Sequence, residues 1–140
     1  MLISTRGRYA LRILTDMAER HSGEFLPLKE LAQRQNLSEK YLESIIQSLV
    51  KGGLLEAARG KCGGYRFART PEDVTVWEVL SLTEGSLGAV GCHWEGEAAC
   101  ERMSECRSVP LWQGLNRVIQ EYLSGYTVAD LARSGPEETA

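Results

Sequence analysis

Residues 26–69 read LPLKELAQRQNLSEKYLESIIQSLVKGGLLEAARGKCGGYRFAR, and this stretch decides the fold. Its first part predicts a short helix after Pro27, a turn at Asn36 and a longer helix capped by Ser38. The glycine pair at 52–53 ends that helix. Two short strand-like runs follow, joined by a glycine-rich turn, and they predict a β-hairpin. Helix, turn, helix and hairpin in this order are typical of a winged helix-turn-helix.

The segments on either side of this unit are predicted to be helical. Residues 5–21 carry apolar side chains at three- and four-residue steps, as a helix buried on one face does. After Pro71, the runs VTVWEVLSLTEG, PLWQGLNRVIQEYLSGY and TVADLAR predict a short helix, a long helix and a final short helix. The expected fold class is mainly α with a small β-hairpin: a winged helix-turn-helix domain plus a long dimerisation helix.

Charge divides the chain into two unlike parts. Residues 1–69 hold twelve Lys and Arg against seven Asp and Glu, a net charge of +5, whereas residues 70–140 carry −8. A basic half suits a polyanion such as DNA. We expect a DNA-binding domain at 1–83, a cysteine-bearing loop at 84–108, the dimerisation and C-terminal helices at 109–134, and a disordered tail at 135–140.

The longer helix of the unit and the hairpin tip carry the groups expected to contact DNA. Hydroxyl and cationic side chains bind phosphates, and a carboxylate accepts from a cytosine amino group. The expected DNA-binding residues are Arg8, Ser38, Lys40, Tyr41, Glu43, Arg59 and Lys61. Arg6 and Arg12 of the first helix are further candidates for phosphate contacts. For the helix taken alone, an ordinary polar surface is the alternative.

The long predicted helix carries an apolar stripe that so small a fold cannot bury. Its members are Leu111, Leu115, Val118, Ile119 and Tyr122. An unburied stripe of this length indicates self-association, and we therefore expect a homodimer. The alternative is that the helix packs back on its own domain.

Three of the four cysteines lie within residues 92–106, CHWEGEAACERMSEC, in the pattern C-x7-C-x5-C. The chain has neither a run of about 18 apolar residues nor a signal-peptide core, so we expect a cytoplasmic protein without a membrane span. Thiols stay reduced there, and clustered cysteines indicate metal or redox chemistry. We find no phosphate-binding glycine loop or nucleophile elbow, and two histidines are few for acid–base catalysis, so no enzyme is expected.

Four segments in register carry a family resemblance. They are STRGRYALR (4–12), LSEKYLESIIQSLVKGGLL (37–55), ARGKCGGYRFAR (58–69) and PLWQGLNRVIQEYL (110–123). Together they resemble the IscR/NsrR/CymR (Rrf) family of bacterial winged-helix transcription regulators over nearly the whole chain. The resemblance implies a homodimer that crosses through the long helix and binds palindromic DNA. It also implies an iron–sulfur cluster on three loop cysteines, with a 2Fe–2S cluster expected ahead of a 4Fe–4S cluster.

The resemblance carries three ligand positions over to this chain: Cys92, Cys100 and Cys106. The fourth ligand departs from the family pattern. The histidine that IscR-like members place three residues after the third cysteine is Val109 here. The aspartate of nitric-oxide-sensing relatives is Arg8. His93 is the best remaining donor, beside nearby glutamates, and the cluster would respond to iron, redox state, nitric oxide or cluster supply.

Two other functions remain open from the sequence. One is a CymR-like repressor of cysteine or sulfur metabolism, controlled by a partner protein, in which the thiols are incidental. The other is a small zinc-binding protein or an electron carrier. Cys62, in the hairpin turn, is expected not to be a ligand, because that turn is predicted to lie at the DNA.

Overall fold

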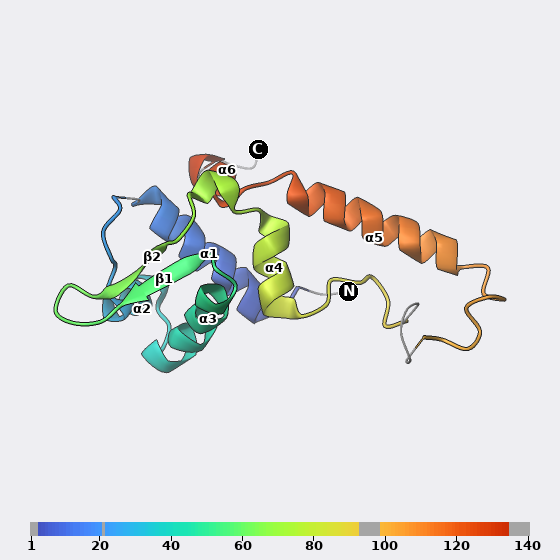
Figure 1. Ribbon diagram of the computed structural model, residues 1–140, viewed down its shortest axis with the longest axis horizontal. Coiled ribbons are helices and arrows are strands. Elements are labelled where there is room, and N and C mark those ends of the chain that lie inside the picture. Colours follow the sequence, from blue (N-terminus) through green and yellow to red (C-terminus); the bar gives the residue numbers. More distant parts are fainter. Residues whose placement is uncertain (1–2, 21, 93–98, 135–140) are drawn as a thin grey trace.

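The computed structural model describes residues 3–20, 22–92 and 99–134. Along the chain these form α1 (Thr5–Glu19), α2 (Leu28–Gln35), α3 (Glu39–Lys51), β1 (Leu55–Ala58), β2 (Gly64–Phe67), the 3-10 turn η1 (Pro71–Asp73), α4 (Val76–Glu84), α5 (Val109–Ser124) and α6 (Val128–Ser134). The two strands are antiparallel neighbours. The expected fold class, mainly α with one hairpin in winged helix-turn-helix order, is confirmed (Figure 1).

Local side-chain chemistry explains where the helices begin and end. The Ser38 hydroxyl accepts from the backbone N–H of Tyr41 at 3.2 Å, so Ser38 caps α3 as predicted. Asn36 adopts a left-handed conformation, with φ of 54°, and turns the chain between α2 and α3. Thr75 and Glu78 exchange hydrogen bonds in a capping box at the start of α4.

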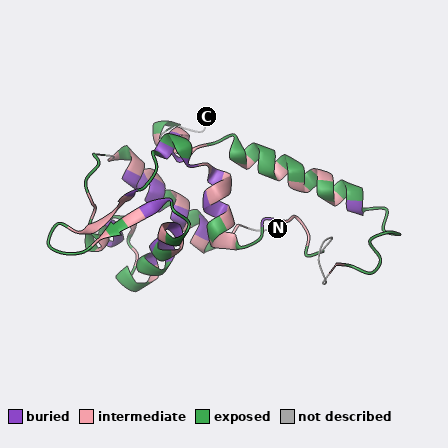
Figure 2. Ribbon diagram, viewed as in Figure 1, coloured by how far each residue is buried: buried purple, intermediate pink, exposed green. Residues whose placement is uncertain are grey.

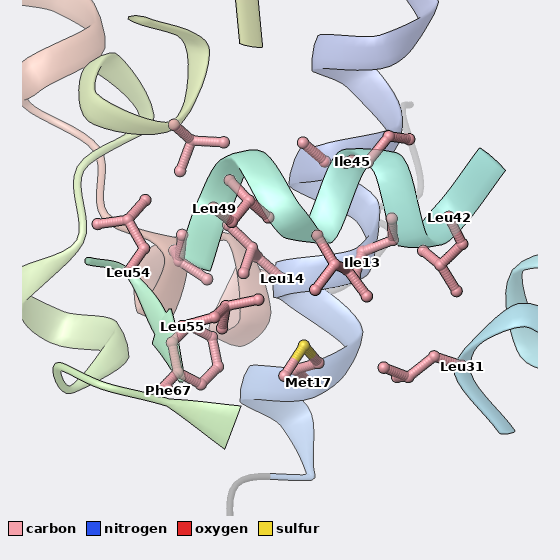
Figure 3. Packing of buried hydrophobic residues seen from close by; sticks show 14 of the residues in the cluster. Ile13, Leu14, Met17, Leu31, Leu42, Ile45, Leu49, Leu54, Leu55 and Phe67 are labelled. Carbon is pink, nitrogen blue, oxygen red and sulfur yellow. The ribbon is translucent and has the colours of Figure 1, made fainter. Parts of the chain in front are cut away.

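One apolar core fixes the three helices and the hairpin together (Figure 3). Helices α1 and α3 supply half of its buried residues from one face each, and α2, the strands, α4 and α6 close its other sides. The labelled members are Ile13, Leu14, Met17, Leu31, Leu42, Ile45, Leu49, Leu54, Leu55 and Phe67. Burying each large side chain stabilises the fold by about 1.5–3 kcal/mol.

A buried carboxylate ties α1 to α2. Asp16 is 7% exposed and accepts from the Arg34 guanidinium at 2.9 and 2.5 Å. Gln35 donates to the same carboxylate at 3.2 Å. The hydrogen bond from Arg34 to Asp16 raises the pKa of Arg34, so the guanidinium stays charged and holds α2 against α1.

The hairpin, with its turn at 59–63, forms the wing, which is anchored on the segment before α2. Leu26 and Tyr65 exchange backbone hydrogen bonds of 2.8 and 2.9 Å. Gly64, which precedes Tyr65, has a φ of 146°. A Cβ on Gly64 would lie 2.2 Å from the carbonyl oxygen of Leu26. Only glycine permits this approach, so it fixes where the wing leaves the body.

Helix α6 packs on α1 rather than beside α5. Val128 is fully buried in the core, and Thr127 forms an isolated bridge with Thr75. Thr127 also caps α6 through reciprocal hydrogen bonds with Asp130 of 3.1 and 2.9 Å. The chain therefore returns to the winged-helix body after α5.

Helix α5 projects from that body, and most of its surface is exposed (Figures 1 and 2). Among its described side chains only Val109 is buried, whereas Leu111, Val118 and Tyr122 are 59–63% exposed. Ile119 is half-buried and shares a helix face with Leu123, which packs against the α4 cluster. The expected stripe is thus exposed except at Ile119, which turns toward the body.

Candidate nucleic-acid interface and cysteine connector

The exposed face of α3 carries the predicted DNA-contacting groups. Lys40 and Glu43 are exposed, and Ser38 is exposed at the N-terminal end, with its hydroxyl already capping the helix. Tyr41 is less exposed than these residues. Its half-buried ring packs edge-on against the Tyr9 ring, with 6.1 Å between the ring centroids. Tyr41 therefore contributes to packing between α1 and α3, beside any contact it makes outward.

A concavity of about 620 Å³ separates α3 from the wing. Its α3 wall carries Glu43, Gln47 and Lys51, and Arg59 and Tyr65 line the wing side. Burial raises the pKa of Tyr65, and the nearby Glu43 carboxylate raises it further, so this phenol stays protonated. The structure thus brings two predicted residues, Glu43 and Arg59, to one groove.

The groove also contains two residues that sequence reasoning missed. Gln47 and Lys51 follow Glu43 at steps of four along α3, and both are exposed. This spacing places all three on one helix face. A search along the Glu43 face at four-residue steps would have found them. An amide and an ammonium there add donors for bases and phosphates.

The first-helix arginines differ in where their guanidinium groups lie. Arg8 is exposed and donates only to the neighbouring Thr5 hydroxyl at 3.1 Å among the contacts of the described residues. Arg12 lies over the Tyr9 ring at 5.1 Å. Arg6 is half-buried and donates to Ser44 and Ser48 of α3, so its guanidinium is already engaged within the protein, and its expected phosphate contact stays a prediction.

The connector, residues 85–108, joins α4 to α5 and carries three predicted ligands. Cys92, Cys100 and Cys106 are free and exposed. Cys62 is also exposed, but it lies in the wing, at the opposite end of the molecule from the connector (Figure 1). The Ser108 hydroxyl, 3.2 Å from the sulfur, lowers the pKa of Cys106 and so favours its thiolate.

The donor chemistry of the connector fits an iron–sulfur cluster, whose usual protein ligands are thiolates. Within residues 3–20, 22–92 and 99–134, no three His, Cys, Asp or Glu side chains already meet at one point suited to a metal ion. The three cysteines are thus exposed side chains on the segment between α4 and α5. His93, the expected fourth ligand, lies outside the described residues.

Comparison with known proteins identifies the family. A family model named Rrf2 and described as "Iron-dependent Transcriptional regulator" matches residues 3–134. The chain belongs to the Rrf2 family. This confirms the resemblance and makes the protein a transcription regulator rather than an enzyme. In the described part of this Rrf2 chain, no helix has the length and apolar character needed to cross a membrane.

Curated relatives and solved structures extend the Rrf2 match over the whole fold. The regulator IscR of Aliivibrio salmonicida is 33% identical, covering 94% of this chain and 77% of the relative. Protein rrf2 of Nitratidesulfovibrio vulgaris is 36% identical, covering 95% and 88%. CymR of B. subtilis matches with a TM-score of 0.75 at 34% identity, covering 96% of this chain and 98% of CymR. IscR of T. potens matches with a TM-score of 0.73 at 30% identity, covering 100% of this chain and 92% of that IscR chain.

Proposed function

We propose that this Rrf2 protein is a homodimeric regulator whose binding to DNA responds to an iron–sulfur cluster on Cys92, Cys100 and Cys106. The observation that carries the proposal is the placing of three exposed thiols on one connector, directly before α5. The description of the matching family as iron-dependent supports it.

The DNA-binding half of the proposal assigns α3 to the major groove and the wing to the adjacent backbone. Lys40 and Glu43 are exposed on α3, and Arg59 and Lys61 are exposed on the wing. The groove between the two elements is lined by Glu43 and Lys51 from α3 and by Arg59 from the wing. A two-fold dimer presents two such units, which suits a palindromic operator.

The sensing half assigns the connector thiols as cluster ligands, with His93 as the candidate for the fourth position. When bound, a cluster supplies a centre that is sensitive to iron supply, oxidants and nitric oxide, with 2Fe–2S preferred. Where the fourth ligand is not a cysteine, a different donor atom binds the cluster, and this donor alters the reduction potential of the cluster. The lowered pKa of Cys106 favours its thiolate, which is the form that binds iron.

The test is purification without oxygen, followed by a visible spectrum and assays of iron and sulfide. We expect a coloured protein with stoichiometric iron and sulfide. Its affinity for an operator should differ from that of the same preparation after the cluster is removed. A colourless protein with bound zinc would instead identify a structural zinc site.

The likeness to CymR supports a second candidate function. CymR, called the global cysteine regulator of B. subtilis, covers 96% of this chain at 34% identity. A regulator of cysteine or sulfur metabolism, controlled by a partner protein, would bind its operator equally well with and without iron. Equal operator affinity before and after removal of the metal would favour this candidate over cluster sensing.

Arg59→Ala tests the wing as a phosphate-binding element. We expect weaker binding to operator and random DNA alike, and a salt dependence flatter by about one log–log unit, because one phosphate contact is lost. Titration at several salt concentrations measures both effects. An unchanged slope would place Arg59 away from the phosphates.

Glu43→Ala tests base readout by α3. Since Glu43 is exposed on the groove wall, its loss should alter the preference among operator variants by roughly 1–3 kcal/mol at one base position. Competition between operators that differ at single positions measures this preference. Equal changes on all sequences would argue against a readout role.

A further inference from the structure

Arg6 forms a forked contact between α1 and the middle of α3. Its guanidinium donates to the Ser44 hydroxyl at 3.0 Å, the Ser44 carbonyl at 2.7 Å and the Ser48 hydroxyl at 2.8 Å. Ser44 follows Glu43 directly and lies one helical turn after Lys40. Arg6 therefore binds α3 beside the residues that are predicted to contact DNA.

A second contact holds the end of α1 from which Arg6 projects. Ser4, the N-cap of α1, donates from its backbone N–H and its hydroxyl to the Glu84 carboxylate at 3.0 and 2.6 Å. The Ser4 hydroxyl in turn accepts from the Gly7 N–H at 3.1 Å. A carboxylate at a helix N-terminus is also favoured by the helix dipole.

We propose that Arg6 is a positioning residue for DNA recognition, and that Glu84 positions Arg6 through Ser4. The contacts run from Glu84 at the end of α4, through the first turn of α1, to Ser44 and Ser48 of α3; we call this series the positioning relay. The positioning role rests on DNA binding by α3 and not on a bound cluster.

Directional contacts are needed here because the core alone leaves α3 some freedom. Apolar burial is non-directional, so it fixes the depth of α3 more firmly than its rotation or its position along its own axis. Hydrogen bonds to a backbone carbonyl and two hydroxyls fix both. A recognition surface must be held within about 0.5 Å to read its target, and the relay supplies that constraint.

The relay also gives the connector a route to α3. Gly85, the first residue of the connector, follows Glu84 directly, so a displacement of the connector acts on the Glu84 carboxylate. This extension, unlike the positioning role, rests on the proposed sensing function. It identifies α1 as the element between the sensing loop and the recognition helix.

The salt dependence of DNA binding separates positioning from phosphate binding. We expect Arg6→Ala to weaken operator binding roughly tenfold, which is the loss that about one net charged hydrogen bond would cause. The salt slope and the affinity for random DNA should be unchanged. Arg6→Lys should lose nearly as much, because one ammonium cannot reproduce the fork. Arg8→Ala, two residues away and exposed, is the matched control and should flatten the slope.

Rescue by lysine, or a flatter slope in Arg6→Ala, would identify Arg6 as a phosphate ligand and overturn its positioning role. Circular dichroism and thermal unfolding of each variant establish that the compared proteins are folded. These measurements use cluster-free full-length protein. If the wild-type protein purified without oxygen holds no iron, the sensing proposal fails, whereas the test of Arg6 is unaffected.

Gly7→Ala tests the Glu84 contact without altering any charge. A Cβ at Gly7 would lie 2.2 Å from the Glu84 carboxylate oxygen and 3.1 Å from Leu80 Cδ2, so the Glu84 side chain must leave Ser4 and the Leu80 side chain must shift slightly. Alanine favours a helix more than glycine does. The variant should stay folded, which thermal unfolding checks, while it weakens operator binding several-fold; undiminished operator affinity would overturn the role of Glu84.

A double-mutant cycle tests whether the two contacts act in series. If Glu84 acts through Arg6, the Arg6→Ala/Glu84→Ala double variant should bind operator no more weakly than Arg6→Ala alone. If the two contacts acted independently, the fold-losses in operator affinity of the two single variants would multiply in the double variant. That result would contradict the relay.

Discussion

Serine at Cys92, Cys100 or Cys106 is expected to remove nearly all iron and sulfide from protein purified without oxygen. Each of these residues is an exposed thiol on the connector, and the proposed cluster has only one further ligand. A hydroxyl does not ionise near neutral pH and is a poor substitute for a thiolate. Iron and sulfide assays, with the visible spectrum, measure the loss directly.

Cys62→Ser is the matched control for this series. Cys62 is also a free, exposed thiol, but it lies on the wing, far from the connector along the molecule (Figure 1). Its replacement should leave iron, sulfide and colour unchanged. Loss of the cluster from the Cys62 variant would overturn the ligand assignment, as would full retention in the three connector variants.

The Leu115→Asp/Val118→Asp variant is expected to be monomeric and to lose roughly 100-fold in operator affinity, because two linked half-site contacts become one. Both residues belong to the exposed stripe of α5. Charges there are tolerated in a monomer, which leaves them in water, but they are expensive when buried unpaired in a dimer interface. Sedimentation and operator titration measure the two effects.

The choice of these positions follows from the exposure of α5. Ile119 is half-buried, so a charge there would also disturb packing within one subunit. Gln113→Asp/Gln120→Asp is the matched control, because both glutamines are exposed outside the stripe on the same helix. A stripe variant that stays dimeric with intact operator affinity would show that α5 is not the interface.

Much of the fold was predictable because its signals are local. Ser38 and Asn36 specify helix ends through their own backbone or that of near neighbours, and both act as expected. Likewise, the glycine-rich turn predicted the hairpin, since its residues must adopt conformations that glycine permits. Spacing of apolar residues identified the buried faces of α1 and α3.

The features that sequence reasoning missed depend on contacts between distant residues. The three arginines of α1 look alike in the sequence, yet Arg6 meets Ser44 and Ser48, 38 and 42 positions away. Ile119 fits the apolar stripe by spacing, but the proximity of α4 turns its face inward. No local pattern reports which neighbour a helix face meets.

The candidate site divides in the same way. Exposure of Lys40, Glu43 and Arg59 followed from helix periodicity and the hairpin turn. The ligand assignment of the cysteines rests on the family resemblance, because spacing within a loop does not determine distances between sulfur atoms. Gln47 and Lys51 could have been found at four-residue steps from Glu43, whereas the groove that they line depends on how the wing lies relative to α3.

The sparse packing of α5 bears on the fate of an unpaired subunit in the cell. A helix of 16 residues is only marginally stable alone, and α5 buries little against its own body. If the proposed dimer forms through α5, a subunit without its partner would open first along this helix, where chaperones bind apolar side chains and proteases cut exposed backbone. Turnover would then remove orphan chains while sparing assembled ones, so that the amount of regulator is set by pairing as much as by synthesis.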